Sequence, residues 1–124
     1  MISNFFYVGL GGFLGAICRY GVSRLVNSLL PLSFIPWGTI LVNASGSFLL
    51  AFLMTSTAQK YTIPAQISLL LGTGLLGAYT TFSTFTYEAI SLYQHSVLRG
   101  ILYSFVMLIT GFLFALAGFI IGKN

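Results

Sequence analysis

The chain has 124 residues, of which 57% are hydrophobic and only 5% are charged, and its formal net charge is +4. Because a soluble domain has roughly a quarter charged residues, this composition excludes an ordinary soluble fold and indicates a protein that is solvated by a bilayer. A single cysteine and a single histidine offer no internal disulfide and no metal cluster, and the few scattered basic residues form no patch for nucleic acid.

Four apolar segments are long enough to cross the hydrocarbon core, which requires about 20 helical residues. They cover about 4–26, 35–58, 64–93 and 98–122. Short polar or proline-marked connections separate them and leave no room for a second domain. We therefore expect one all-α integral membrane domain over residues 1–124, with four transmembrane helices.

The basic residues that set the orientation of a membrane protein are almost equally divided between the two sides. Lys60 and Lys123 lie on the side of the N-terminus, and Arg19, Arg24 and Arg99 lie on the other. Such a balance allows insertion in both orientations and antiparallel pairing of identical subunits. Since four helices would also make a thin wall around any pore, we expect an antiparallel, dual-topology homodimer.

The third segment is unusually long and has three glycines within six positions, Gly72, Gly74 and Gly77. Each glycine weakens a helix by about 1 kcal/mol relative to alanine, so we expect this helix to be broken near its middle. A break frees backbone amides and carbonyls, which are tolerated only where they face protein, water or an ion. The alternative is a continuous helix whose glycines serve packing.

Other small residues recur in pairs at helical spacing. The pairs are Gly11 with Gly15, Gly111 with Ala115, and Gly118 with Gly122. Such pairs let helix backbones approach closely in lipid. We interpret them as packing positions that select no substrate.

Asn43 lies near the centre of the second segment. A carboxamide buried there must find hydrogen-bond partners. Its NH2 group could donate to an anion, and it could equally bond to another helix. The residue pattern leaves both interpretations open.

Residues 80–86 contain five hydroxyl side chains and two phenylalanines. Phe82 and Phe85 share one helix face, which is flanked by Ser83 and Thr84. Because the edge of an aromatic ring is electropositive, these edges could line a path for an anion. The alternative is that the rings pack against lipid or neighbouring helices while the hydroxyls bond to the carbonyl four residues earlier.

Two charged side chains lie inside the predicted membrane segments, and each has two possible roles. Arg19, near the far end of the first segment, would anchor at the headgroups or attract anions to a vestibule. Glu88 is the only acidic residue, and it would carry protons in a coupled transporter or lie at a pore mouth. No nucleophile with its base and no pair of carboxylates is present, so we expect no enzyme.

Three motifs, taken together, carry a family resemblance. They are Gly11-Gly12-Phe13-Leu14-Gly15-Ala16 with Arg19-Tyr20, then Gly38-Thr39 with Val42-Asn43 and Gly46-Ser47-Phe48, then Gly77 with Thr80-Thr81-Phe82-Ser83-Thr84-Phe85. In this order and at this spacing, the chain resembles the Fluc (CrcB) fluoride channels over essentially its whole length.

The resemblance implies a fluoride-selective channel of the bacterial cell membrane, which lets fluoride leave passively and so protects against fluoride toxicity. It also implies an antiparallel dimer with two pores. In these pores, Phe82 and Phe85 would form an aromatic constriction, with Asn43, Ser83 and Thr84 as donors.

The same resemblance implies a structural sodium ion that is not transported. The backbone carbonyls of Gly77 and Thr80 from both chains would hold it at the centre of the dimer. Family members often have a second glycine where this chain has Ala78 and a smaller residue where it has Tyr79. Carbonyl ligation does not depend on these two side chains.

Two other functions are consistent with the residues alone. A small proton-coupled exporter of the four-helix dimer type would need a membrane-embedded carboxylate, for which Glu88 is the candidate. A non-conducting scaffold would need only the glycine faces. Fluoride flux through reconstituted protein, with and without a proton gradient, distinguishes these functions from a channel.

Overall fold

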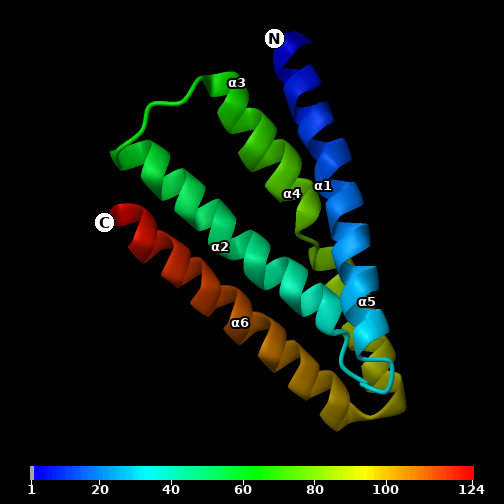
Figure 1. Ribbon diagram of the computed structural model, residues 1–124. Coiled ribbons are helices and arrows are strands. Elements are labelled where there is room, and N and C mark those ends of the chain that lie inside the picture. Colours follow the sequence, from blue (N-terminus) through cyan, green and yellow to red (C-terminus); the bar gives the residue numbers. More distant parts are fainter. Residues whose placement is uncertain (1) are drawn as a thin grey trace.

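The computed structural model describes residues 2–124, which form helices joined by short connections. Helix α1 covers Ile2–Leu29, α2 covers Trp37–Gln59 and α6 covers Val97–Lys123. All three are long and apolar enough to cross a membrane. Between α2 and α6, the chain makes a further passage in several pieces (Figure 1).

This passage, the third along the chain, corresponds to the predicted segment 64–93. Its pieces are α3 (Ala65–Ser68), the π-helical segment η1 (Leu69–Leu76), α4 (Gly77–Tyr79) and α5 (Phe82–His95). The ends of all four passages agree with the predicted segments to within a few residues. The prediction of an all-α membrane protein with four spans is confirmed.

The third passage is broken at Thr80 and Thr81, which confirms the expected interruption of this helix. Thr80 (φ −78°, ψ 155°) and Thr81 (φ −149°, ψ 119°) are extended and separate α4 from α5. The glycines that were expected to cause the break do not lie in it. Gly72 and Gly74 belong to η1, and Gly77 begins α4.

Glycines instead bring α1 against the first half of the third passage, which runs beside it in Figure 1. A Cβ atom at Gly11 would collide with the carbonyl oxygen of Leu70, and one at Gly15 would collide with that of Leu75. Gly74 faces Gly11 across the same contact. The predicted packing role of Gly11 and Gly15 is therefore confirmed, and η1 uses its own glycine for the same purpose.

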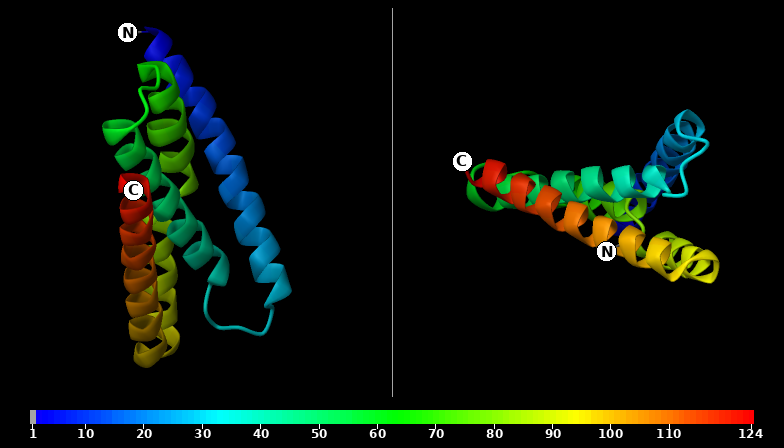
Figure 2. Two further views of the ribbon diagram at one scale, coloured as in Figure 1. Left: turned by 60° about the vertical axis from the view of Figure 1, so that its left-hand side comes forward. Right: turned by 90° about the horizontal axis from the view of Figure 1, so that it is seen from below.

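Helices α2 and α6 form the second close pair and run side by side in Figures 1 and 2. A Cβ atom at Gly118 would collide with the carbonyl oxygen of Phe48, and one at Gly122 would lie 2.9 Å from that of Phe52. This confirms the packing role of that pair. Among the described residues, no atom outside its own helix lies within 4 Å of a Cβ at Gly111, so the packing expected there is not found within one chain.

The core of the molecule lies where α2, α5 and α6 meet. Tyr103 is fully buried and packs with Ile40, Phe85, Ala89 and Met107. These side chains come from all three helices, so the cluster fixes α5 against α2 and α6 immediately after the break.

The close contact at Gly15 can be tested by stability. Gly15→Ala should destabilise the protein, because the added methyl group would collide with the backbone of Leu75, which cannot rotate away. Overpacking of this kind typically costs about 1–3 kcal/mol. The measurement is the midpoint of thermal unfolding in detergent, followed by the folded peak in size-exclusion chromatography.

Gly9→Ala is the matched control in the same helix. Among the described residues, nothing outside α1 lies within 4 Å of a Cβ at this position. Alanine favours a helix more than glycine does, so this variant should be as stable as the original protein or more stable. Equal midpoints for the two variants would contradict the contact at Gly15.

Candidate functional site

The side chain of Asn43 on α2 bonds directly to the break in the third passage. Its Oδ1 accepts a hydrogen bond from the Thr81 amide at 2.7 Å, and its Nδ2 donates to the Thr81 carbonyl at 2.9 Å. One carboxamide therefore supplies both bonds that Thr81 would make in a continuous helix. The second Nδ2 hydrogen has only the sulfur of Met107 nearby, at 3.5 Å.

The break deprives the carbonyl groups of residues 77–80 of their usual helical donors, and the partners of two of these donors are defined. In a continuous helix, the carbonyl of Gly77 would accept from the amide of Thr81, four residues later. The carbonyl of Thr80 would likewise accept from the amide of Thr84. The Thr81 amide donates instead to Asn43, and the Thr84 amide donates to Thr81 Oγ1 at 3.2 Å. The carbonyls of Gly77 and Thr80, predicted as sodium ligands, are thus two of the four, residues 77–80, that the break separates from their helical donors.

Thr81 also caps the N-terminus of α5. Besides accepting from the Thr84 amide, its hydroxyl donates to the Thr84 hydroxyl at 3.0 Å, which leaves the Thr84 hydrogen available for another acceptor. The hydroxyls of Ser83 and Thr81 lie 3.3 Å apart. Two hydroxyls in residues 80–86 donate to backbone carbonyls: Thr80 donates to that of Leu76 at 3.1 Å, and Thr86 donates to that of Ser83. A threonine immediately before a helix is a known N-cap signal, and it was not used in predicting the site.

Phe82 and Phe85 begin the first turn of α5, and their rings are in contact. The ring centroids lie 5.5 Å apart at an interplanar angle of 66°, which is an edge-to-face arrangement. Phe85 is buried and lies 5.6 Å from the ring of Tyr103, whereas Phe82 is 72% exposed. The predicted shared face is confirmed, but one ring is anchored in the core and the other projects from the chain.

A cavity of about 430 Å³ adjoins these rings, and we call it the break cavity. It is lined by Asn43, Ser47, Thr80, Thr81, Phe82, Phe85, Met107, Leu108, Gly111 and Phe112. Four of these side chains are polar and come from α2 and the break, while α5 and α6 supply the apolar wall. Gly111, where a Cβ atom would meet no other helix of residues 2–124 within 4 Å, contributes an open surface here.

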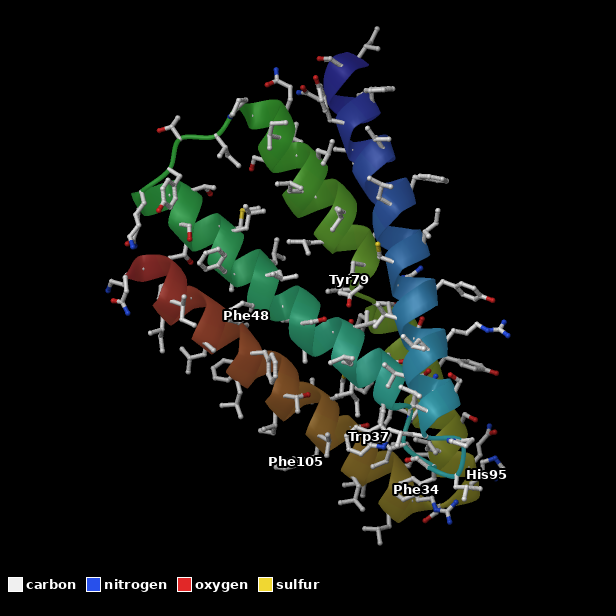
Figure 3. The ribbon with its side chains drawn as sticks, viewed as in Figure 1. Phe34, Trp37, Phe48, Tyr79, His95 and Phe105 are labelled. Carbon is white, nitrogen blue, oxygen red and sulfur yellow. The ribbon has the colours of Figure 1, made fainter. Side chains whose placement is uncertain are left out.

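Tyr79 adds a bond between α4 and α2, and Figure 3 shows its side chain beside the break. Its hydroxyl lies 3.0 Å from the hydroxyl of Ser45. Because Ser45 donates its single hydrogen to the carbonyl of Leu41 at 2.7 Å, Tyr79 must be the donor in this pair. The larger residue at this position therefore ties the end of α4 to α2.

Glu88 on α5 joins three helices. Its Oε1 accepts from the hydroxyl of Thr39 on α2 at 2.9 Å, and its Oε2 accepts from the hydroxyl of Tyr103 on α6 at 2.5 Å. Both donors are buried. Sequence reasoning considered Glu88 but did not identify Thr39 or Tyr103. They could have been sought from the sequence, because an acidic residue inside a membrane span needs polar partners on neighbouring helices.

A second cavity, of about 220 Å³, lies on the other side of the break, and we call it the polar cavity. It is lined by Ala16, Arg19, Tyr20, Ser23, Asn27, Thr39, Thr81, Thr84 and Glu88. Thr81 lines both cavities, which places the break between them. Of the predicted residues, Arg19 and Thr84 meet in the polar cavity. Ser83 is exposed and lines neither cavity.

Known proteins resemble this chain over nearly its full length. The model of the CrcB-like family (Camphor Resistance, CrcB) matches residues 6–119. The fluoride-specific ion channel FluC of Thermotoga petrophila is 50% identical over 121 residues, which cover 98% of this chain and 95% of that protein.

Two further relatives carry related names. FluC of Thermosipho melanesiensis is 42% identical over 121 residues, covering 98% of this chain and 97% of that protein. FluC 2 of Carboxydothermus hydrogenoformans is 44% identical over 116 residues, covering 93% and 84%. The resemblance carried by the three motifs is confirmed, and the chain belongs to the CrcB family.

Proposed function

We propose that this chain is a fluoride-selective ion channel that lets fluoride leave the cell passively and so protects it from fluoride toxicity. The observation that carries the proposal is the broken third passage, where hydroxyl groups, a carboxamide and two aromatic rings gather around two cavities. The relatives described above are named fluoride-specific ion channels. A multi-pass protein of the cell membrane with no enzymatic activity agrees with these names and with the long apolar helices.

The residues at the break offer many weak donors to a fluoride ion that gives up part of its hydration. The free hydrogen of Thr84 and the second Nδ2 hydrogen of Asn43 are such donors. The hydroxyl of Ser83, whose hydrogen points to Thr81 at 3.3 Å in one chain, would join them by turning toward the ion. The electropositive edges of Phe82 and Phe85 add weaker contacts. No lysine or arginine lines the break cavity among the described residues. Binding that is favourable but weak at several sites is what conduction requires.

Arg19 supplies positive charge at the approach to this path. It lines the polar cavity, in which Glu88 is already engaged by two hydroxyl donors. A guanidinium at the wall of a water-filled cavity raises the local concentration of anions. The proposed role of Arg19 is therefore attraction in a vestibule, with the neutral donors acting further along the path.

The proposal includes an antiparallel homodimer with two pores. Its support is the polar surface that one chain leaves uncovered in the membrane, since Gly77 is exposed and Phe82, which lines the break cavity, is exposed as well. Lipid offers no hydrogen-bonding partner to such groups. A second copy lying over the break would remove this cost and supply the missing wall of each pore. The balanced distribution of basic residues supports an inverted copy.

A structural sodium ion between the two copies is also part of the proposal. The carbonyls of Gly77 and Thr80 suit this role, because the amides that would bond to them in a helix are engaged elsewhere. Hard cations prefer oxygen ligands of this kind. When bound, the ion would supply positive charge that holds these oxygens together and would not be transported.

The first functional prediction concerns transport itself. Purified protein in potassium-loaded liposomes should release fluoride when valinomycin is added, because a passive anion current needs a compensating flow of cations. Chloride release should be far slower, and a proton gradient should not change the fluoride rate. A fluoride electrode measures the efflux. Uphill fluoride movement driven by a proton gradient would favour the exporter, and no flux at all would favour the scaffold.

The second prediction concerns the aromatic rings. Phe82→Ile keeps an apolar side chain but removes the electropositive ring edge. An aromatic contact is worth about 0.5–1.5 kcal/mol, so efflux should fall by up to about tenfold. Phe85→Ile should also reduce efflux, with an added loss of stability because this ring is buried against Tyr103.

Phe105→Ile is the control for both variants, because Phe105 projects from α6 (Figure 3), is 63% exposed and lines neither cavity. All three variants are compared with the original protein at matched dimer content. Undiminished efflux in both Phe82→Ile and Phe85→Ile would return these rings to a purely packing role.

The third prediction concerns sodium. Replacing sodium with N-methyl-D-glucamine should lower the thermal stability of the dimer. Thr80→Ser should keep this sodium dependence, because the ligand is the backbone, whereas Gly77→Val should abolish it. Within one chain, a Cβ at Gly77 makes only an ordinary contact, 3.6 Å from the Gly72 carbonyl oxygen. A dimer whose stability is indifferent to sodium would contradict the proposed ion site.

A further inference from the structure

Asn27 lies near the end of α1, where this helix meets the start of α2. Its Oδ1 accepts a hydrogen bond from the Gly38 amide at 2.9 Å. Because a backbone N–H can only donate, the oxygen of the carboxamide must be the atom that faces Gly38. A Cβ atom at Gly38 would lie 2.6 Å from the carbonyl oxygen of Ser23, so α1 and α2 are in close contact here. The side chain of Asn27 is therefore held in one orientation.

The nitrogen of this carboxamide points away from Gly38 with two hydrogens to donate. Among residues 2–124, Nδ2 of Asn27 makes no hydrogen bond, and the residue is exposed. Asn27 lines the polar cavity and also a neighbouring cavity of about 340 Å³ beneath the connection 30–36. Phe34 of this connection and Trp37, which follows it, lie at this end of the molecule in Figure 3. Asn27 thus lies between the polar cavity and this neighbouring cavity, which we call the outer cavity.

The groups around Asn27 in the polar cavity offer several donors to a small anion. Arg19 supplies a positive charge, and Ser23 and Tyr20 supply hydroxyls. The hydroxyl of Tyr20 accepts from Arg24 at 2.8 Å, so its own hydrogen is available to a ligand. Each oxygen of the Glu88 carboxylate, the acceptor in this cavity, already receives a hydrogen bond.

We propose that Asn27 is a further fluoride-contacting residue, whose Nδ2 donates a hydrogen bond to fluoride as the ion enters the path through the polar cavity. This inference rests on the proposed channel function. A neutral donor can replace part of the hydration of the ion without retaining it, as a path of several weak sites requires. Asn27 then acts between attraction by Arg19 and the donors at the break.

The alternative is a purely structural role, in which Asn27 only caps the start of α2. The variant Asn27→Asp separates the two roles. Aspartate keeps an oxygen to accept from the Gly38 amide, but it loses both Nδ2 hydrogens and adds a negative charge. A hydrogen bond to a charged group corresponds to roughly a tenfold to hundredfold effect. We expect efflux from liposomes to fall by at least about tenfold while the thermal midpoint of the dimer is unchanged.

Two comparisons separate the loss of a donor from the gain of a charge. Ser28→Asp adds the same charge at the adjacent residue, which lines neither cavity and bonds to the carbonyl of Leu25, and its efflux should stay near that of the original protein. Exposed charges are screened within about 3 Å at 1 M salt, against about 10 Å at 0.1 M. The defect of Asn27→Asp should therefore persist in potassium sulfate at an ionic strength of about 1 M.

Several results would overturn the inference. They are efflux at the original rate from folded Asn27→Asp, an equal defect in Ser28→Asp, or a defect that disappears at high salt. If Asn27→Asp does not fold, Asn27→Ser removes the amide without adding a charge and should show the same loss at matched dimer content. The original protein is measured alongside. If it released no fluoride, the proposed channel function would be contradicted, whereas the absence of a defect in Asn27→Asp alone would contradict only the role of Asn27.

Discussion

The pair of hydrogen bonds between Asn43 and the backbone of Thr81 is the interaction on which the rest of this site depends. A backbone amide or carbonyl left without a partner in lipid costs several kcal/mol, so a break in the middle of a span requires a substitute for the helix itself. Asn43 is that substitute. Once the Thr81 amide is engaged by Asn43, the Gly77 carbonyl loses its helical donor, and α5 can begin afresh with Thr81 as its cap. The two phenylalanines then fall on the first turn of the new helix, and a cavity lies on each side of the break.

The polar side chains of α2 continue on both sides of Asn43 along this helix. Thr39, Asn43 and Ser47 are spaced four residues apart and so share one face of the helix. Thr39 lines the polar cavity, where it bonds to Glu88, while Asn43 and Ser47 line the break cavity. One helix face therefore passes from one cavity to the other beside the break. Because Thr39 and Asn43 are each engaged by another passage, this polar face also joins the helices, and it combines a structural role with the donors that a path for fluoride needs.

The sequence was sufficient to predict the four spans, because hydropathy and length alone determine what can cross a bilayer. It also predicted a break in the third span, but its position was inferred from glycine propensity, which is worth only about 1 kcal/mol per residue. Gly74 is used for close contact with α1 instead, and the interruption occurs where Asn43 can bond to Thr81. Interhelical partners were the information that the sequence lacked. For this reason the role of Asn43 stayed open, Tyr103 was not connected with Glu88, and Gly111 was expected to pack where it instead borders a cavity.

Asn43 and Asn27 use the same chemistry at the two cavities. Each carboxamide oxygen accepts from a backbone amide, that of Thr81 or of Gly38, and this bond fixes which way the nitrogen points. Aspartate could accept the same bond but would repel an anion, and lysine could attract an anion but has no acceptor for the amide. Asparagine is thus suited to hold a backbone in place and to present a neutral N–H to a cavity from the same side chain. Asn43 donates one of its two Nδ2 hydrogens to Thr81, whereas Asn27 keeps both of its own among the described residues. In the proposed channel, the carboxamide would therefore offer an entering anion more hydrogens at the mouth, where the ion is still largely hydrated, than beside the break, where hydroxyls and ring edges would share the contact.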